Sequence, residues 1–392
     1  MKIGLVLPSG PGYTETFFRS KIEGLQKSGH QVILFCTNNP ENFNDCPVYL
    51  LPERSPSKIK QVFRMWLEYL KLLPHFKTIK HYIALEREDG TTWSRIFKRI
   101  YNNAPMFKYE LDWLHFGFGT LVMDCQNVAA ASKTKMAVSF RGFDIGVYPI
   151  KHPHCYQKLW DKVSKIHVIS DDIAQLVHDQ GFKGQVPLVK ITPAINTSYF
   201  LAPEQKTESD LVRIVTVGRL HWKKGLDYTL QALSILKKEG ILFEYTIIGA
   251  GFEEEALKFA VYQLGLKDQV IFKGKLDPKD VKKELLKSHI YVQYSVQEGF
   301  CNAVLEAQAM GLLCIVSDAE GLAENILDGQ TGWVVPKRQP DLLASKIKDT
   351  IGLSKTKKQQ IRDAAIIRVQ QQFNIEKQQL EFIEFYKENK TI

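Results

Sequence analysis

Residues 211–233 read LVRIVTVGRLHWKKGLDYTLQAL. The first eight are an apolar, β-branched run typical of a strand buried inside a parallel sheet, and 226–238 have the spacing of a helix. Arg219 and Lys224 lie in the short loop between these two elements. A strand that leads through a short loop into a helix is the repeating unit of α/β domains, whose ligands bind beyond the carboxyl ends of the strands. We therefore expect a ligand-binding loop here.

The same alternation of strand and helix continues in both directions. The 392 residues exceed one ordinary domain. We predict an α/β chain of two Rossmann-like domains with parallel sheets, facing one another across a cleft. The predicted domains are 1–191 and 192–373, with a terminal helix at 374–392, capped by Asn374, that packs back on the first domain. Asp171 is predicted to cap a helix that ends before Gly181. The predicted strands are 2–7, 31–36, 112–115, 135–140, 165–169, 187–191, 211–218, 243–249, 269–274, 290–295 and 312–318.

Composition narrows the function classes. Hydrophobic residues make up 44% and charged residues 24%, which excludes disordered and fibrous proteins. Because no run of 18 apolar residues occurs, we expect no transmembrane helix, and the first apolar run is too short for a secretory signal. The six cysteines form no CxxC pair, so we expect neither a disulfide scaffold nor a zinc site, and a cytoplasmic location.

The net charge of +9 is concentrated in one segment, 54–108, which holds twelve Lys or Arg and four Asp or Glu. Basic amphipathic helices that carry Trp and Phe bind anionic membranes, but such faces also pack on domain cores, and both interpretations remain open. Nucleic acid is not expected, because no nucleic-acid-binding signature accompanies the charge. Two apolar helix faces occur in the segment: Ile59, Val62, Phe63, Trp66, Leu67, Leu70 and Leu73, then Trp93, Ile96, Phe97, Ile100 and Tyr101. The cations off these faces are Lys60, Arg64 and Lys71, then Arg95, Lys98 and Arg99.

Two motifs carry candidate chemistry. Arg219 and Lys224 stand beside a helix N-terminus and suit a diphosphate, although surface cations without a ligand are the alternative. The run EGFCNAVLEAQAMG at 298–311 supplies Glu298 and Glu306. Carboxylates can accept hydrogen bonds from sugar hydroxyls, but near a helix start they can also be ordinary N-terminal charges. The GAG run at 249–251 lacks the third glycine of a dinucleotide fingerprint, so we interpret it as a tight turn and not as an NAD site.

These motifs carry a resemblance. GRLHWKKG, IIGAG, EGFCNAVLEAQAMG and VSDAEGLAENILDGQTGWVVP resemble, in order and spacing, the C-terminal domain of glycosyltransferase family 4. GPGYTETFFRSKIEGLQKSGHQV, SFRGFDIGVYP and KIHVISDDI resemble its exopolysaccharide branch, which includes colanic-acid-type transferases. The resemblance implies a GT-B fold and a hexosyltransferase that retains anomeric configuration. It implies a nucleotide-sugar donor, UDP- or GDP-linked, a glycan or lipid-linked saccharide acceptor, cell-surface polysaccharide synthesis, and no metal or other cofactor.

The resemblance also implies roles for individual residues. Arg219 and Lys224 would hold the donor diphosphate as it leaves, Glu306 the ribose hydroxyls and Glu298 the donor sugar. In a retaining same-face attack the leaving phosphate takes the acceptor proton, so no strong general base is needed. The remaining expected site residues are the amides of Phe300, Cys301 and Asn302, the first loop with Gly10, Gly12 and Glu15, and His115 and Arg141 on the acceptor side.

The chain departs from the family pattern at two places. Arg141–Gly142 stands where many members have His–Gly, and Arg cannot act as a base at neutral pH, although it can hold an anion. Ala194 and Asn196 stand where Gly and Asp are frequent. Two other functions stay open: an epimerase or hydrolase of nucleotide sugars on the same fold, and a silent binding subunit of a glycan-assembly complex. We expect the protein to be cytoplasmic and attached peripherally to the inner face of the membrane.

Overall fold

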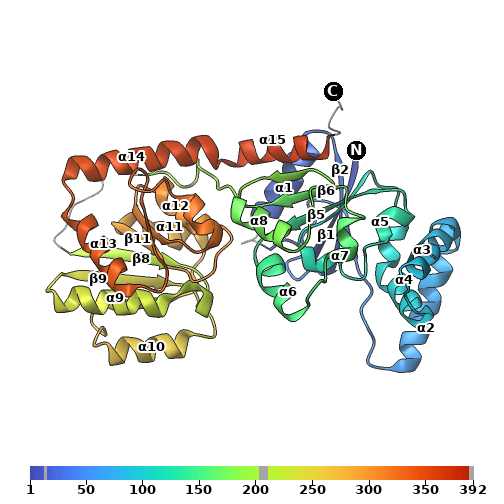
Figure 1. Cartoon of the computed structure of the whole chain (residues 1–392), viewed down its shortest axis with the longest axis horizontal. Coiled ribbons are helices and arrows are strands. Elements are labelled where there is room, and N and C mark those ends of the chain that lie inside the picture. Colours follow the sequence, from blue (N-terminus) through green and yellow to red (C-terminus); the bar gives the residue numbers. More distant parts are fainter. Residues whose placement is uncertain (13–15, 203–210, 388–392) are drawn as a thin grey trace. The chain divides into compact units, whose positions relative to one another are not determined.

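The computed structural model describes residues 1–12, 16–202 and 211–387 (Figure 1). The chain divides into two compact units, which we call unit 1, Met1–Ile191 with Gln378–Ile392, and unit 2, Thr192–Lys377. Each unit is built on one parallel sheet. The predicted α/β class with two parallel-sheet units is therefore confirmed. Of the predicted site residues, Glu15 lies outside the described residues.

Unit 1 contains a seven-stranded sheet in the order β3-β2-β1-β4-β5-β6-β7. All neighbouring strands are parallel. The order reverses between β1 and β4, and such a reversal is where open α/β sheets place their ligands. The strands are β1 Lys2–Ser9, β2 Gln31–Asn38, β3 Val48–Leu50, β4 Trp113–Phe116, β5 Lys135–Phe140, β6 Lys165–Val168 and β7 Leu188–Lys190.

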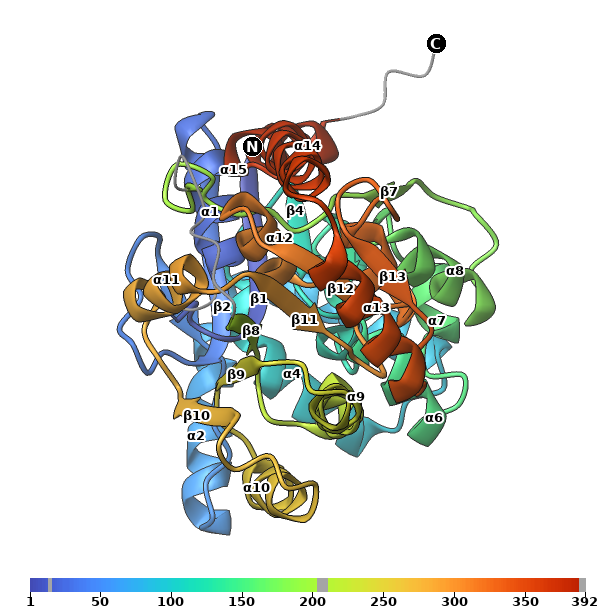
Figure 2. The same ribbon diagram turned by 90° about the vertical axis from the view of Figure 1, so that its left-hand side faces the viewer.

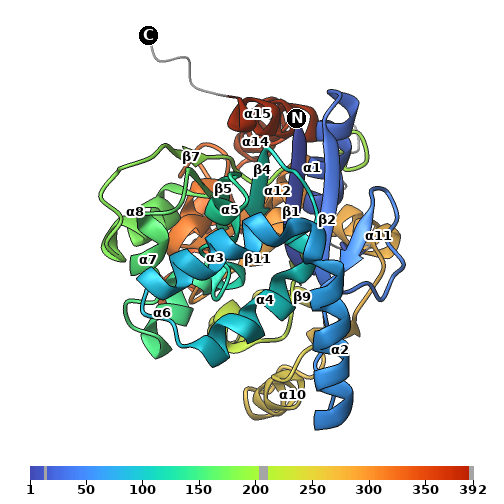
Figure 3. The same ribbon diagram turned by 90° about the vertical axis from the view of Figure 1, so that its right-hand side faces the viewer.

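Two helices far apart in the sequence pack on one face of this sheet. Phe17 and Ile22 of α1 (Thr16–Lys27) join Phe382 and Phe385 of α15 (Ile375–Tyr386) in one buried cluster with β1 and β2. The long connection from β3 to β4 forms a helical layer at one side of unit 1 (Figures 1 and 3). Its helices are α2 Lys58–Lys71, η1 Leu73–His75, α3 Phe76–Glu88 and α4 Trp93–Phe107. Shorter elements are η2 Gly119–Val122, α5 Val128–Ala131, η3 Phe143–Val147, α6 Tyr148–Lys151, α7 Gln157–Trp160 and α8 Asp171–Asp179.

Unit 2 contains a six-stranded parallel sheet in the order β10-β9-β8-β11-β12-β13, which reverses between β8 and β11 (Figure 2). One buried cluster joins the sheet to α9, α10 and α13, and a second joins it to α11 and α12. The strands are β8 Val212–Val217, β9 Phe243–Ile248, β10 Val270–Gly274, β11 Ile290–Gln293, β12 Leu313–Ser317 and β13 Trp333–Val335. The helices are η4 Trp222–Lys224, α9 Leu226–Lys238, α10 Glu254–Gln263, α11 Pro278–Lys287, α12 Asn302–Ala309, η5 Glu320–Asn325, α13 Pro340–Gly352 and α14 Lys355–Gln372.

Of the two helix N-caps predicted from the sequence, one is wrong and the other is confirmed. Asp171 is not the cap of α8, because the side chain of Ser170 accepts the hydrogen bond from the amide of Ile173 and Asp171 lies in the first turn. Asn374 caps α15 as predicted, with its side-chain oxygen 2.7 Å from the amide nitrogen of Lys377. Among the described residues, no helix has both the length and the apolar character needed to cross a bilayer.

Candidate functional site

Two loops of unit 2 meet where the strand order reverses. The loop after β8 ends at Gly225, whose φ is +56°, and the loop after β11 begins at Tyr294. A Cβ on Gly225 would lie 2.2 Å from the carbonyl oxygen of Tyr294, so only glycine allows this approach. The amide of Val296 donates to the carbonyl of Lys223 at 2.7 Å. The backbone therefore fixes the two loops against each other.

Their side chains are joined as well. Lys224 and Glu298 form an ion pair, and the side chains of both are largely buried. Burial by itself disfavours the charged ammonium, but the carboxylate of Glu298 outweighs this effect and raises the pKa of Lys224. Arg219, in the same loop, is exposed. The predicted diphosphate ligand Lys224 and the predicted sugar ligand Glu298 are thus brought together, with a second cation nearby in the chain.

The GAG turn packs directly on the loop that carries Arg219. A Cβ on Gly249 would lie 1.8 Å from the carbonyl oxygen of Gly218, and one on Gly251 would lie 2.1 Å from that of Leu220. The amide of Leu220 donates to the carbonyl of Ala250 at 3.0 Å. This close packing explains both glycines and agrees with the prediction of a tight turn.

Helix α12 follows the Glu298 loop and carries Glu306. The side chain of Glu306 is partly exposed, and desolvation of its carboxyl raises its pKa to about 7. Of the three amides predicted to face the donor sugar, that of Cys301 donates to the side-chain oxygen of Asn325 at 3.2 Å. Asn325 returns a bond to the carbonyl of Cys301 at 3.0 Å. The Phe300 ring lies against Phe373, with the ring centroids 5.7 Å apart.

A row of polar side chains leads from the sheet to Glu298, and the sequence analysis missed it. The hydroxyl of Tyr291 donates to Gln293 at 2.9 Å, and the amide nitrogen of Gln293 donates to the hydroxyl of Ser295 at 2.9 Å. That hydroxyl lies 3.5 Å from a carboxylate oxygen of Glu298. Polar residues at every second position of an otherwise apolar strand were the available signal, because this spacing places them on one face.

In unit 1 the first loop packs closely on the residues after β2. The amide of Gly10 donates to the carbonyl of Asn38 at 2.8 Å. A Cβ on Gly10 would lie 2.1 Å from the side-chain oxygen of Asn39, and one on Gly12 would lie 2.7 Å from that of Glu41. Both atoms are the ends of side chains that can move, so these distances alone do not require glycine, and the role of Gly10 and Gly12 toward the donor stays a prediction.

His115 is completely buried in β4. Its Nε2 lies 2.7 Å from the hydroxyl of Ser139, which lies 2.8 Å from Nδ1 of His167, and Nε2 of His167 lies 3.0 Å from the carbonyl oxygen of Ile191. A carbonyl only accepts, so each ring carries its proton on Nε2. Nδ1 of His115 accordingly accepts from Lys21 at 3.1 Å. The structure places His115 inside the core of unit 1, and its acceptor-side role stays a prediction.

Arg141 follows β5 and is enclosed by aromatic rings. Its guanidinium carbon lies 3.8, 4.6 and 5.5 Å from the ring centroids of Phe17, Phe18 and Phe118. Its Nε donates to the carbonyl of Gly117 at 3.3 Å. These contacts tie α1 to the ends of two strands by cation–π attraction. Whether Arg141 also holds an anionic acceptor stays a prediction.

No group of three or more His, Cys, Asp or Glu that could hold a metal ion occurs in the part of the chain that the structure describes. The loop after β8 carries the cations Arg219, Lys223 and Lys224, and the loop after β11 leads into the N-terminus of α12. The positive end of that helix dipole and its first amides favour an anion. The arrangement can therefore stabilise a leaving diphosphate through side chains and backbone.

Comparison with known proteins defines the class. Residues 201–366, which include both loops, match the family described as Glycosyl transferases group 1. HepE from Anabaena, solved in complex with UDP, shares the fold: the TM-score is 0.73 at 15% identity, over 98% of this chain and 99% of that one. The chain is a glycosyltransferase with a GT-B fold.

Two relatives indicate its type. "Putative colanic acid biosynthesis glycosyltransferase WcaL" of Escherichia coli (strain K12) is 24% identical over 88% of this chain and 90% of its own length. "Amylovoran biosynthesis glycosyltransferase AmsK" of Erwinia amylovora is 29% identical over 62% of this chain and 61% of its own length. The chain thus groups with glycosyltransferases of the exopolysaccharide type, in agreement with the family 4 resemblance.

Proposed function

We propose that this enzyme transfers a hexosyl group from a nucleotide sugar to a glycan or lipid-linked saccharide, with retention of configuration, in cell-surface polysaccharide synthesis. The observation that carries the proposal is the Lys224–Glu298 pair at the reversal of strand order in unit 2. The names of the two relatives support the polysaccharide context. The complexes of HepE with UDP and with UDP-glucose support a UDP-linked donor, and a GDP-linked donor is the alternative.

The charge that develops during the transfer and the hydroxyl groups of the donor suggest a role for each site residue. As the nucleoside diphosphate departs, negative charge grows on its oxygens, and Lys224 and Arg219 stabilise it. Glu298 binds the sugar next to the bond that breaks, and Glu306 accepts hydrogen bonds from the ribose. In a same-face attack the departing phosphate oxygen takes the proton of the acceptor hydroxyl as the new glycosidic bond forms. No side-chain base is then required, and no metal or other cofactor is part of the proposal.

An anionic membrane surface is the proposed partner of α2. This helix, all of whose residues the structure describes, contains no buried residue. Ile59 is 84% exposed and Trp66 55%, and the rings of Phe63 and Trp66 stack 6.2 Å apart. An apolar helix face turned to solvent beside lysines fits the interfacial region of an anionic bilayer. Free thiols at all six cysteines fit a reducing compartment, so we place the enzyme on the cytoplasmic side of the membrane.

Part of the apolar face of α4 packs on the core of unit 1, and part of it is exposed. Ile96, Ile100 and Tyr101 are buried in unit 1, as core packing requires. Trp93 and Phe97 are exposed, and their rings stack 6.2 Å apart. The exposed surface of α4 therefore adds two aromatic rings to the surface offered by α2, and the remaining residues hold the helix on its unit.

A panel of donors tests the catalytic proposal. The enzyme is mixed with UDP-, GDP- and ADP-linked sugars, and its thermal unfolding is recorded for each, because a bound ligand raises apparent stability. The donor that binds is then incubated with membrane lipid extracts, and the products are analysed for anomeric configuration. Transfer with retention supports the proposal. Inversion, epimerisation, hydrolysis alone or no reaction contradicts it, and the last result would favour a silent binding subunit.

A further inference from the structure

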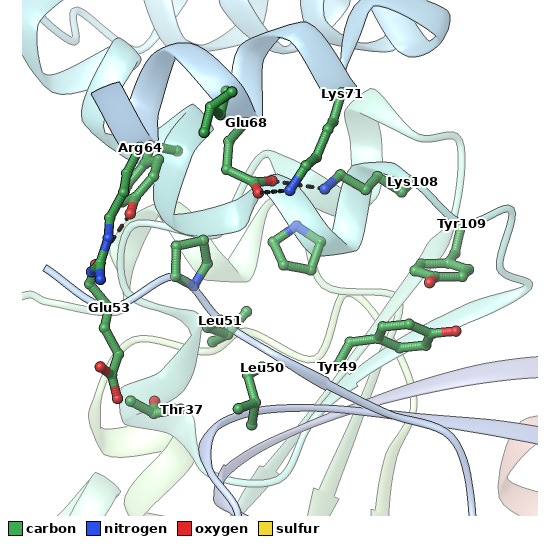
Figure 4. Close-up of a pocket in the computed structure, with 14 residues that line it drawn as sticks. Thr37, Tyr49, Leu50, Leu51, Glu53, Arg64, Glu68, Lys71, Lys108 and Tyr109 are labelled. Atoms are coloured by element: carbon green, nitrogen blue, oxygen red, sulfur yellow. Dashed lines mark hydrogen bonds and ion pairs between the residues drawn. The ribbon is translucent and has the colours of Figure 1, made fainter. Parts of the chain in front are cut away.

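A cavity of about 630 Å³ lies in unit 1 beneath α2 (Figure 4). We call it the α2 cavity. Thr37 near the end of β2 and Leu50–Pro52 at the end of β3 form its floor. It therefore stands at the carboxyl ends of the two outermost strands on this side of the sheet, and not at the reversal between β1 and β4. Neither the family match over 201–366 nor the predicted donor and acceptor residues include this cavity.

The wall that α2 provides is charged. Arg64, Glu68 and Lys71 line the cavity and recur at spacings of four and three residues, so they share one face of the helix. The exposed apolar residues Ile59 and Trp66 lie on another face. Helix α2 is thus turned with charged groups toward the protein and apolar groups toward the surroundings. Insertion of the apolar face into a bilayer would bring the cavity next to the headgroups.

One carboxylate holds two lysines in this wall. Glu68 pairs with Lys71 at 2.7 Å and with Lys108, at the end of α4, at 2.8 Å. Figure 4 shows the two ammonium groups converging on Glu68. Although partial burial acts against its charge, the two lysines lower the pKa of Glu68, so it is a carboxylate at neutral pH. With Arg64 and Glu53 included, the lining residues carry three cations and two carboxylates.

Aromatic rings complete the lining. The rings of Tyr49 and Tyr109 are 4.6 Å apart and lie on the side of the cavity away from Glu68 (Figure 4). Tyrosine rings offer an apolar face to a sugar ring and a hydroxyl for hydrogen bonding. Cations, carboxylates and tyrosines together match a ligand that has both phosphate and sugar groups.

We propose that the α2 cavity binds the diphosphate-linked sugar end of a membrane-embedded lipid, with Lys71, Lys108 and Arg64 on the phosphates and Tyr49 and Tyr109 on the sugar. This inference rests on the proposed function, since such a lipid would be the acceptor. Before the ligand enters, Glu68 holds the two lysines together. When the ligand enters, the two lysines leave Glu68 and pair with its phosphates. The lipid chain leaves the cavity on the side of the apolar face of α2.

Vesicle binding tests this site without relying on catalysis. Phosphatidylcholine vesicles are prepared with either phosphatidylglycerol or a polyprenyl diphosphate, matched in surface charge, and binding is measured by sedimentation. Free inorganic pyrophosphate is titrated in parallel. The wild type should prefer the diphosphate vesicles. Equal binding to both vesicle types would overturn the site, and pyrophosphate that binds as tightly as the vesicles would overturn the lipid-borne source.

Two variants should have effects of opposite sign, and a third serves as the control. Lys71→Gln with Lys108→Gln should weaken binding to diphosphate vesicles about tenfold or more, because charge-assisted bonds are lost. Glu68→Gln should strengthen it, because two lysines lose their competing carboxylate. Lys77→Gln with Lys80→Gln, on exposed positions of α3, is the matched control and should change both vesicle types equally.

Circular dichroism establishes that each variant is folded. Weaker diphosphate binding by folded Glu68→Gln, or an unchanged preference in the double lysine variant, would overturn the proposal even if the enzyme is active. If the wild type uses no nucleotide sugar, the proposed function fails instead, and the vesicle result stands by itself.

Discussion

Lys224 and Glu298 lie 74 residues apart in the chain and form one ion pair across the two loops that end β8 and β11. Each partner fixes the position of the other. The pair places a cation expected on the diphosphate next to a carboxylate expected on the sugar, so the bond that breaks in the reaction would lie between them. Loss of Lys224 should therefore affect donor binding, whereas loss of Glu298 should affect turnover.

Replacing Lys224 should weaken donor binding. Lys224→Ala removes one partner of the diphosphate charge, and a charge-assisted contact contributes about 1.5–3 kcal/mol, or roughly 10- to 100-fold in affinity. Calorimetric titration with the nucleoside diphosphate measures the change. Lys258→Ala on α10, an exposed lysine paired with Glu254, is the control. Unchanged nucleotide binding in folded Lys224→Ala would refute the assignment.

The two carboxylates should separate in their effects. Glu298→Gln should lower turnover and leave nucleoside diphosphate binding nearly intact, because its expected partner is the sugar. Glu306→Ala should weaken nucleotide binding itself, because its expected partners are the ribose hydroxyls. Steady-state rates and titrations on both variants provide the comparison. The division of roles is wrong if the two variants bind nucleotide equally.

Donor affinity should depend on pH through Glu306. Its pKa is about 7 in the folded chain, against an ordinary value of 4.5. The ionised form accepts hydrogen bonds from hydroxyls, so nucleoside diphosphate affinity should fall as the pH drops from about 8 through 7. Because the folded state holds this proton more tightly than the unfolded chain, the same residue adds stability as the pH falls toward 4.5. Titrations between pH 5.5 and 8.5 should show a flatter profile for Glu306→Gln, and an identical profile would contradict the assignment.

The buried histidines of unit 1 should have the opposite effect on stability from Glu306 as the pH falls. Burial, then the nearby cations Lys21 and Arg141, hold the pKa values of His115 and His167 well below 6.5. The unfolded chain therefore binds protons first, and the stability contributed by the neutral rings is lost as the pH falls below about 6.5. The protection factors of the amides of β4, β5 and β6, which correct for the intrinsic pH dependence of exchange, should fall between pH 6.5 and 5. His167→Gln should reduce this pH dependence, and an unchanged slope would show that the rings do not cause it.

Membrane attachment should depend on exposed cations and on Trp66. Near-surface cations contribute about 1 kcal/mol each on anionic lipid, so changing Lys60, Arg95 and Lys98 to Glu should release the enzyme from phosphatidylglycerol vesicles. Trp66→Ser should weaken attachment even in high salt, where charges are screened. Lys71 and Arg99 are unsuitable for reversal, because they pair with Glu68 and Glu86. Changing Lys238, Lys279 and Lys357 of unit 2 to Glu is the control, and equal binding to neutral and anionic vesicles would contradict the proposal.

Much of the fold could be predicted from sequence because its main strands are apolar and separated by helices. The alternation missed β3 and β13, since three residues such as Val48–Leu50 and Trp333–Val335 are too short to show a period. In unit 2 the motifs located Lys224 and Glu298 correctly on two loops, but their ion pair follows from the parallel order of β8 and β11 and is not visible in either motif.

Sequence also could not reveal which way a side chain faces. The family resemblance predicts an acceptor-side role for His115, which stays a prediction. The sequence did not show that His115 shares a sheet face with Trp113, since alternate residues of a strand point the same way, and that both lie in the core. Similarly, the period of α2 reveals an apolar face but not the medium that the face meets. Only the packing of residues distant in the chain decides such questions.

Helix α2 also has a consequence for how this sequence can change over evolutionary time. The hydrophobic residues that form its outer face add nothing to the interior of unit 1, since the helix, described along its whole length, has no buried side chain. Substitutions there are free of the volume restrictions that govern Ile96 or Ile100. The packing of the core of unit 1 and the character of the outer face of α2 are thereby encoded by separate residues. Under the proposed membrane contact, related chains could adapt to bilayers of different lipid composition through α2 alone, while the residues that specify the fold stay the same.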